Sequence, residues 1–321
     1  MEISDINSKF SELLESKTVP VITGPTASGK TGLSLRLAEI IPLEIVSADS
    51  RQIYKFMNIC TAKPSDDELK SVKHHFIDIL APDEDYNAGR FGDEAERIVE
   101  DIFSRGKLPV VVGGSGLYIQ SLCEGLFAQD ENIALKGIRS FLNEKLEKKG
   151  RDYLYMELEK IDKAAAEKYQ DKNPRRVLRA LEYYYTYGES ILNSRKQKKT
   201  KRNFNYKYFG INFEREKLYE RINLRSELMW RNGLLDETVK ILKMGYSPEL
   251  NSLNTVGYKE TLAYINRKCT EKEAIEEIKK NTRRYAKRQM TWFRKISEMH
   301  WFDVKDYKEE EIPGIEILKN I

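Results

Sequence analysis

Residues 19–31 read Val-Pro-Val-Ile-Thr-Gly-Pro-Thr-Ala-Ser-Gly-Lys-Thr, a short apolar run followed by a loop between two glycines. The second part fits the pattern G-x-x-x-x-G-K-[ST], and apolar residues then recur at the spacing of one helix face. A strand, this loop and a helix in succession form a phosphate-binding unit, in which backbone N–H groups and the helix N-terminus face one anion. Lys30 adds a point charge, and the hydroxyl of Thr31 can bind Mg²⁺.

The phosphate loop consists of Gly24, Pro25, Thr26, Ala27, Ser28, Gly29, Lys30 and Thr31. Many ATP-using proteins with this loop also carry an apolar strand that ends in an acid. Here residues 109–112 run into Gly-Gly-Ser-Gly, and the nearest acid at the end of a strand is Asp49. Because the carboxyl ends of parallel strands surround the ligand crevice, we expect Asp49 beside the phosphate loop. A role in a turn or a helix cap would also explain this residue.

The first half of the chain alternates β-rich runs with helical patterns, which is typical of a parallel sheet. The predicted strands are residues 19–23, 43–48, 76–80, 109–112, 206–213 and 300–304, and the predicted helical stretches are residues 125–200, 215–243 and 270–298. We therefore predict an α/β protein, a P-loop NTPase-like parallel sheet flanked by helices, with an all-helical insertion domain. The core covers residues 1–122 and 203–321, with basic C-terminal helices in its second part, and the insertion covers residues 123–202.

The composition is that of a globular protein, with 321 residues of which 40% are hydrophobic and 33% charged. Three isolated cysteines and three histidines do not form a disulfide or zinc pattern. His74-His75 lacks a third ligand candidate, which favours a strand start over a metal site. We expect no membrane span or signal peptide and a cytoplasmic location, because no apolar stretch is long enough.

Two segments hold much of the positive charge. Residues 195–202 contain six basic residues, residues 279–295 contain eight, and neither contains an acid. Without these segments the net charge of +4 becomes −10 for the rest of the chain. An acidic body with two basic strips suits a polyanionic partner, although a solvated surface is the alternative explanation. A third basic group, Arg175, Arg176 and Arg179, is either an anion clamp or an exposed helix face.

Six segments closely resemble, in this order, the motifs of the bacterial tRNA dimethylallyltransferases, also called tRNA isopentenyltransferases. They are GPTASGKT (24–31), SADSRQIYKFMNICTAKP (47–64), VVGGSGLYI (111–119), NPRRVLRALE (173–182), NTVGYKE (254–260) and TRRYAKRQMTWFRK (282–295). The resemblance implies transfer of a dimethylallyl group from dimethylallyl diphosphate to N6 of adenine 37 in tRNAs that read codons beginning with U. It implies Mg²⁺ as cofactor and tRNA as partner, and we expect a monomer.

The resemblance also implies roles for single residues. The catalytic residues would be Asp49, Lys30, Thr31 and Arg221, with Asp49 as general base, Thr31 as metal ligand and Arg225 as a second arginine near the diphosphate. The tRNA contact would consist of Asp49, Ser50, Arg51, Gln52, Ser115, Lys136, Arg175, Arg176, Val177, Leu178, Arg179, Asn254, Thr255, Val256, Gly257, Tyr258 and Lys259. The helical insertion would grip the anticodon stem.

The chain departs from the family pattern at four positions. Phe56, Asn58 and Cys60 stand where the family usually has Gly, Asp and Gly, and Ser115 stands for Thr but keeps the hydroxyl. These changes affect the expected substrate preference or rate and leave the reaction class unchanged.

The implied reaction explains why the acid after residues 109–112 is missing, since the phosphate loop would hold a leaving group and no phosphoryl group would be transferred. Backbone N–H groups of residues 26–31, Lys30, Thr31 and an arginine would stabilise the departing diphosphate. Two other classes fit the same loop. One is a small-molecule or nucleotide kinase with the arginines of residues 175–179 as a lid, and the other is a non-catalytic P-loop RNA-binding protein.

Overall fold

The computed structural model describes residues 2–125, 133–194, 203–307 and 312–321, with residues 133–136 and 194 described by their backbone alone. The chain divides into two compact units, one formed by Met1–Glu124 with Arg202–Ile321 and the other by Gly125–Lys201. All six strands belong to the first unit, and the described part of the second unit is helical.

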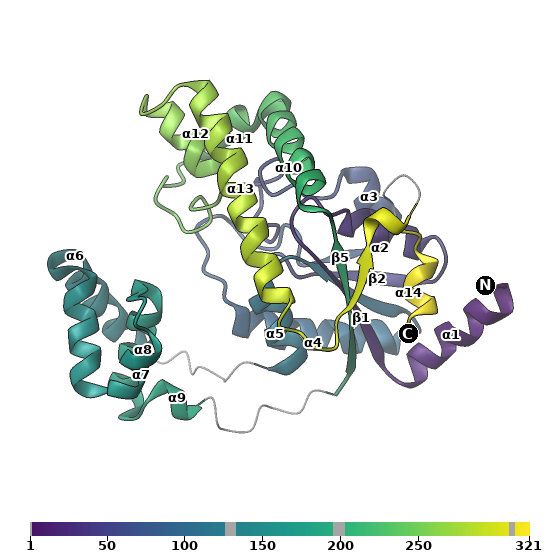
Figure 1. Cartoon of the computed structure of the whole chain (residues 1–321), viewed down its shortest axis with the longest axis horizontal. Coiled ribbons are helices and arrows are strands. Elements are labelled where there is room, and N and C mark those ends of the chain that lie inside the picture. Colours follow the sequence, from purple (N-terminus) through teal and green to yellow (C-terminus); the bar gives the residue numbers. More distant parts are fainter. Residues whose placement is uncertain (1, 126–132, 195–202, 308–311) are drawn as a thin grey trace. The chain divides into compact units, whose positions relative to one another are not determined.

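The first unit is built on one parallel sheet (Figure 1). Its strands are β1 (Thr18–Thr23), β2 (Leu43–Ser47), β3 (His74–His75), β4 (Leu108–Gly113), β5 (Asn205–Asn212) and β6 (His300–Asp303), in the order β3-β2-β4-β1-β5-β6. Every pairing is parallel, and β1 lies between β4 and β5. All six residues of β4 are buried, as expected for a strand covered on both faces. The predicted α/β class with a parallel sheet flanked by helices is confirmed.

Helices cover the sheet because their apolar stripes have no other place to be buried. The helices of this unit are α1 (Ile3–Glu15), α2 (Lys30–Ala38), α3 (Asp66–Ser71), α4 (Ala88–Ser104), α5 (Gly116–Glu124), α10 (Arg215–Met229), α11 (Leu235–Lys243), α12 (Tyr258–Ile265), α13 (Glu271–Phe293) and α14 (Ile315–Lys319), with a 3₁₀ turn at Val304–Asp306. Leu33 and Leu37 of α2 share one core cluster with Ile22 of β1 and Val110 of β4. This packing fixes the phosphate loop, which joins β1 to α2.

The second unit has a core of its own. Its helices are α6 (Ile133–Ile161), α7 (Lys163–Lys168), α8 (Pro174–Tyr187) and α9 (Ile191–Ser194). Leu142, Leu158 and Leu181 are fully buried in it. Helix α6 is interrupted at Gly150, whose φ of 78° is left-handed, and α8 begins with Pro174 after the N-cap Asn173. The predicted helical periodicity of this segment is thus seen in the described residues.

Three predictions about secondary structure were wrong in detail. Residues 76–80 do not form a strand, because Phe76 and Asp78 have φ values of 64° and 55°, which no strand residue adopts. The strand lies just before them, at His74–His75, which agrees with the strand-start interpretation of the two histidines. The stretch 215–243 is divided by a π-helical turn at Trp230–Leu234, and the last long helix ends at Phe293 instead of residue 298. The basic segment 195–202 lies outside the described residues.

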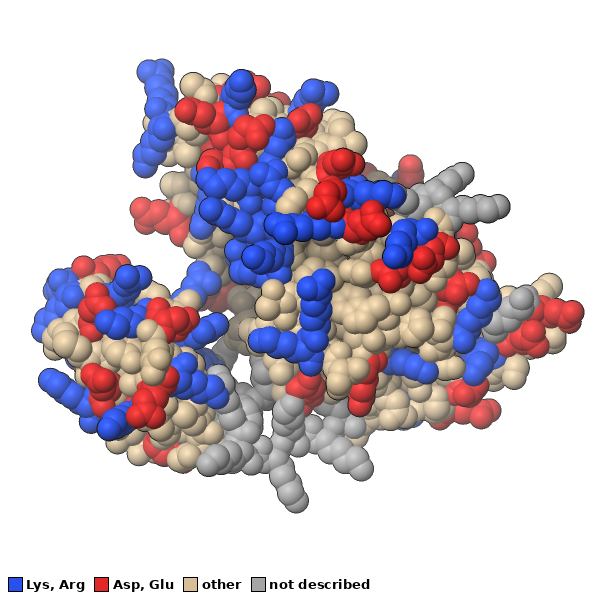
Figure 2. Space-filling view, in the orientation of Figure 1, with Lys and Arg blue, Asp and Glu red and all other residues tan. Residues whose placement is uncertain are grey.

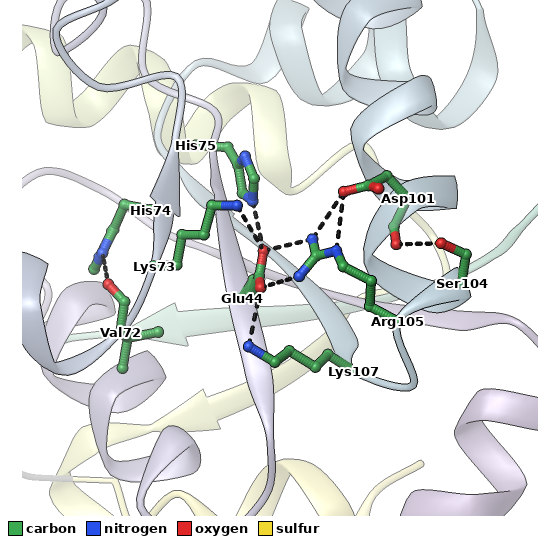
Figure 3. A network of polar contacts seen from close by, with 9 residues as sticks. All are labelled: Glu44, Val72, Lys73, His74, His75, Asp101, Ser104, Arg105 and Lys107. Carbon is green, nitrogen blue, oxygen red and sulfur yellow. Dashed lines mark hydrogen bonds and ion pairs between the residues drawn. The ribbon is translucent and has the colours of Figure 1, made fainter.

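A buried carboxylate joins β2, β3 and the loop before β4 (Figure 3). Glu44 is 1% exposed and binds the side chains of Arg105, His75 and Lys107, with Lys73 3.7 Å away. The hydrogen bonds from Arg105 are the main reason why the pKa of Glu44 lies far below the ordinary value of 4.5, and burial alone would raise it. The network therefore stabilises the fold only while the carboxylate is ionised.

We expect Glu44→Gln to lower the free energy of unfolding by about 2 kcal/mol at pH 7, since the variant leaves several cations without their shared anion. The folded-state pKa is depressed, so the stabilisation is present above pH 4.5 and is lost as the pH falls further. Urea unfolding at pH 7 and pH 3.5 checks this, with Glu276→Gln in an exposed ion pair as the matched control. A constant difference between wild type and variant at both pH values would contradict the explanation.

Candidate active site

The phosphate loop is held in shape by glycine and by its own lysine. Gly24 has a φ of 153°, and a Cβ there would lie 2.9 Å from the Ser28 hydroxyl, so a side chain at this position would crowd the loop. The Nζ of Lys30 donates to the carbonyl oxygens of Gly24 at 3.0 Å and Pro25 at 2.7 Å. The lysine thus lies folded over the loop, at the place where the motif requires its charge.

Burial is the main cause that lowers the pKa of Lys30 from 10.5 to about 7. The positive charge of Arg225 lowers it further, and the carboxylate of Asp49 acts in the opposite direction. A bound anion would reverse most of this effect, because it would restore a counter-charge to the ammonium group.

Asp49 lies in the same small pocket as Lys30 and Thr31, at the carboxyl end of β2. The pocket is also lined by Ser34, Ile45, Ser47, Gln52, Pro64, His74, Val112 and Gly113. One carboxylate oxygen of Asp49 accepts the backbone N–H of Arg51 at 2.9 Å, so the residue stabilises a turn as well. Both interpretations of Asp49 that the sequence allows are therefore compatible with its position.

Residues 50–52 and 115 are connected to one another. The Ser115 hydroxyl accepts the backbone N–H of Ser50 at 3.0 Å, and the backbone N–H of Ser115 donates to the Ala48 carbonyl at 3.1 Å. Gln52 accepts from the Ser47 hydroxyl and donates to the carbonyls of Thr61 and Ala62. The segment after β2 and the loop after β4 thus form one polar wall beside Asp49.

Two arginines of α10 lie at the other side of the phosphate loop. The Nε of Arg221 donates to the Ala27 carbonyl at 2.9 Å, and its guanidinium lies 5.0 Å from the centre of the Phe213 ring. Arg225 lines a larger cleft of about 500 Å³ together with Lys63, Leu228 and Met229. Burial lowers the pKa of Arg225, while the nearby Asp49 carboxylate raises it. Both guanidinium groups thus add positive charge near the phosphate loop.

The segment from Asn254 to Lys259 is positioned by a half-buried acid, Glu237, that the sequence analysis missed. The Glu237 carboxylate accepts the backbone N–H groups of Asn58 and Ile59, each at 2.8 Å, and the Tyr258 hydroxyl at 2.6 Å. Tyr258 is fully buried, so its side chain is placed to support this segment from inside. Asn254 and Lys259 are exposed, and Thr255 and Val256 are half-buried.

Three of the four departures from the family pattern lie at residues 56–60, in the loop whose N–H groups Glu237 binds. Phe56 adopts a φ of 68°, a left-handed conformation that suits glycine, and its ring lies 6.4 Å from that of Tyr246. The Cys60 thiol donates to the Val256 carbonyl at 3.2 Å and occupies the space where a Cβ on Gly257 would lie. Burial, reinforced by the charge of Glu237, raises the pKa of this thiol. The cysteine is therefore a packing residue of the loop.

The residues of the second unit that are predicted to contact tRNA lie on α6 and α8. Arg175 and Arg176 are exposed at the start of α8, and Arg176 is paired with Asp171 at 3.0 Å. Val177 is buried in the core of the unit, Leu178 is half-buried, and burial lowers the pKa of Arg179. Lys136 lies on α6, and its side chain is outside the described part of the chain. Arg175 and Arg176 are thus the most exposed of residues 175–179.

The first three cations of the basic segment 279–295 have polar partners on α10 or α13. Lys279 and Lys280 are each paired with a glutamate one turn earlier, at 2.7 and 2.6 Å, and Arg283 binds the side chain of Asn223. The exposed cations that follow are Arg284, Lys287, Arg288, Arg294 and Lys295. Figure 2 shows Lys and Arg side chains gathered over the region of α13.

The inner face of α13 carries a second residue that the sequence analysis missed. The Oε1 of Gln289 accepts the backbone N–H of Thr26 at 2.9 Å. The expectation that the N–H groups of residues 26–31 all face a bound anion is therefore not met at Thr26, whose N–H is already bound. No pattern local to the phosphate loop could reveal this contact, because its partner lies 263 residues away.

Fold and loop together define a protein of the P-loop NTPase-like class. A family model described as IPP transferase matches residues 52–296. The tRNA dimethylallyltransferase of Acetivibrio thermocellus is 43% identical over 94% of this chain and 96% of its own length, and that of Pelotomaculum thermopropionicum is 41% identical over 95% and 97%. The chain belongs to the IPP transferase family.

Solved structures agree with this assignment. The tRNA delta(2)-isopentenylpyrophosphate transferase of Staphylococcus epidermidis matches with a TM-score of 0.68 and 37% identity, over 94% of this chain and 98% of that one. A eukaryotic dimethylallyltransferase acting on tRNA matches with a TM-score of 0.78 and 30% identity, over 94% and 77%. In the described part of the chain, no helix is long and apolar enough to cross a membrane.

We expect binding of inorganic diphosphate to take up about 0.5 proton at Lys30 at pH 7, because the free lysine, with a pKa of about 7, is half neutral and the anion favours its charged form. The contribution of Lys30 to affinity should fall as the pH rises above 7. Calorimetry in two buffers of different ionisation enthalpy measures the uptake. Lys30→Arg keeps the charge at every pH and is the control, so equal proton uptake in both proteins would contradict the assignment.

Proposed function

We propose that the protein transfers the dimethylallyl group of dimethylallyl diphosphate to N6 of adenine 37 in tRNAs that read codons beginning with U. Membership in the IPP transferase family supports the reaction class. The observation that carries the proposal is the shared pocket of Lys30, Thr31 and Asp49. It combines a site for a diphosphate leaving group with a carboxylate that can take a proton.

The phosphate loop would stabilise the diphosphate as it leaves. An allylic C1 is electrophilic because the developing cation is delocalised, so the demanding part of the reaction is the negative charge that grows on the leaving group. Lys30, Arg221 and the N-terminus of α2 present positive charge where that charge develops. The low pKa of free Lys30 fits this role, since the ammonium form gains most when the anion is present.

Mg²⁺ is the proposed cofactor, and the residues of the pocket fit it. In the described residues there is no cluster of three or more His, Cys, Asp or Glu that could hold a metal ion. Mg²⁺ is commonly bound by one or two protein oxygens together with substrate phosphates, and Thr31, which lines the pocket, would supply its hydroxyl as one of these oxygens. When bound, the ion would neutralise charge on the diphosphate.

Asp49 is the proposed general base. The exocyclic N6 of adenine is a weak nucleophile because its lone pair is delocalised into the ring, and it must lose a proton as the C–N bond forms. A carboxylate oxygen within reach of N6 would accept that proton. Ser50, Arg51, Gln52 and Ser115 surround Asp49 and would contact the adenine and its neighbours, after the base has left the stack of the anticodon loop.

The remaining tRNA contacts are proposed from exposure and charge. In the first unit these are Asn254, Lys259 and the exposed cations of α13. In the second unit they are Arg175, Arg176 and the neighbouring residues of α8, which would grip the anticodon stem. Because the acceptor is a tRNA, the proposed place of action is the cytoplasm.

Incubation of labelled dimethylallyl diphosphate with tRNA and Mg²⁺, in the absence of ATP, tests the function. We expect label to enter the tRNA and diphosphate to be released. ATP-dependent phosphorylation of a metabolite without label transfer would instead support a kinase. Tight binding of tRNA with neither reaction would support a non-catalytic RNA-binding protein.

We expect Asp49→Asn to lower kcat by a factor of about 10² to 10⁴, because an amide cannot accept the proton of N6. The amide oxygen can still accept the N–H of Arg51, so the turn is preserved. Single-turnover transfer and tRNA binding are measured in parallel, with the exposed Asp83→Asn as control. Asp49 would lose the role of base if the variant kept a normal kcat, or if the loss lay in tRNA affinity.

A further inference from the structure

Gln289 connects two loops of the active site through its side-chain amide. It lies on α13 and is 6% exposed. Its Oε1 accepts the backbone N–H of Thr26, and its Nε2 donates to the carbonyl of Gly114, each at 2.9 Å. A backbone N–H on one side and a carbonyl on the other fix the orientation of the amide, since a flipped amide would lose both hydrogen bonds.

In the proposed reaction the two loops would lie beside different reactants, the diphosphate and the adenine. Thr26 lies in the phosphate loop, which would hold the leaving group. Gly114 directly precedes Ser115, whose hydroxyl binds the N–H of Ser50 beside Asp49, on the side proposed for the adenine. One buried amide therefore spans the donor side and the acceptor side of the site.

We propose that Gln289 is a positioning residue that sets the distance between the two reactants. The inference rests on the proposed function, because it assigns the phosphate loop to the diphosphate and the loop after β4 to the adenine. Transfer requires C1 and N6 to approach in line at little more than contact distance, and a misplacement of about 1 Å can cost a factor of about 10² in rate. A rigid amide between the two loops limits that misplacement.

Gly114 lies so close to Gln289 that a substitution at Gly114 would also disturb the hydrogen bond between them. A Cβ on Gly114 would lie 2.3 Å from the Nε2 of Gln289. Gly114 is not among the glycines with positive φ, so alanine is acceptable to its backbone. Gly114→Ala would therefore push the amide away and leave residue 289 itself unchanged.

The exposed neighbours of Gln289 on α13 have a different role. Lys287 and Arg288 are exposed and cationic, and they are proposed to bind the tRNA backbone. Gln289 points into the protein, so its loss should leave tRNA affinity unchanged. The signature of a positioning residue is then a lower kcat with KM for both substrates nearly constant.

We expect Gln289→Met, Gln289→Ala and Gly114→Ala each to lower kcat by a factor of about 10 to 10², with tRNA binding within about twofold of wild type. In the double variant Gly114→Ala/Gln289→Ala the space vacated by the glutamine accepts the new Cβ. The double variant should therefore be no slower than Gln289→Ala alone. Thr291→Val, on the exposed side of the same helix, is the control and should keep the wild-type kcat.

The outcomes separate this inference from the proposed function. If wild type transfers no label, the proposed function is wrong. If wild type transfers label and Gln289→Met keeps a normal kcat, or if the effects of Gly114→Ala and Gln289→Ala multiply, the positioning role is wrong. A variant that loses activity in proportion to its loss of folded protein, measured by thermal unfolding of the same samples, would also overturn it.

Discussion

The carboxyl ends of β1, β2 and β4 meet at one edge of a parallel sheet, and the positions of the phosphate loop and of Asp49 depend on that meeting. The phosphate loop continues β1, Asp49 follows β2, and Gly114 with Ser115 follows β4. Each strand is held by ladder hydrogen bonds to its neighbour, with β4 between β2 and β1. Strand pairing therefore brings residues from three distant parts of the sequence to one edge of the sheet.

Short sequence patterns were sufficient to predict those parts of the fold that neighbouring residues determine. The phosphate loop, five of the six strands and the helical insertion follow from spacing and composition within short windows. The segment 76–80 was misassigned because its apolar residues suggest a strand, whereas Phe76 and Asp78 have left-handed φ values and the N–H of Asp78 donates to the carbonyl of Gln52, far from it in the sequence. Glu237 and Gln289 could not be found in this way, since each binds backbone groups more than 170 residues away.

The loop that differs from the family pattern is held by contacts with other parts of the chain. Phe56 occupies a conformation that glycine adopts without strain, at a cost of about 1–2 kcal/mol. The Glu237 carboxylate binds consecutive N–H groups of this loop, and Cys60 fills the space beside Gly257. Conformation is thus imposed on the loop from outside by the hydrogen bonds and packing of α11 and the segment before α12.

The place at which the helical unit is inserted has a consequence for synthesis of the chain. The central strand β1 pairs with β4 on one side and with β5 on the other, and the helical unit separates these two partners in the sequence. While the ribosome makes residues 125–201, β1 can pair with β4 but its other edge still lacks its partner β5. Such an open edge invites pairing with other chains. The edge is covered only when residues 205–212 have been made and pair with β1 as strand β5.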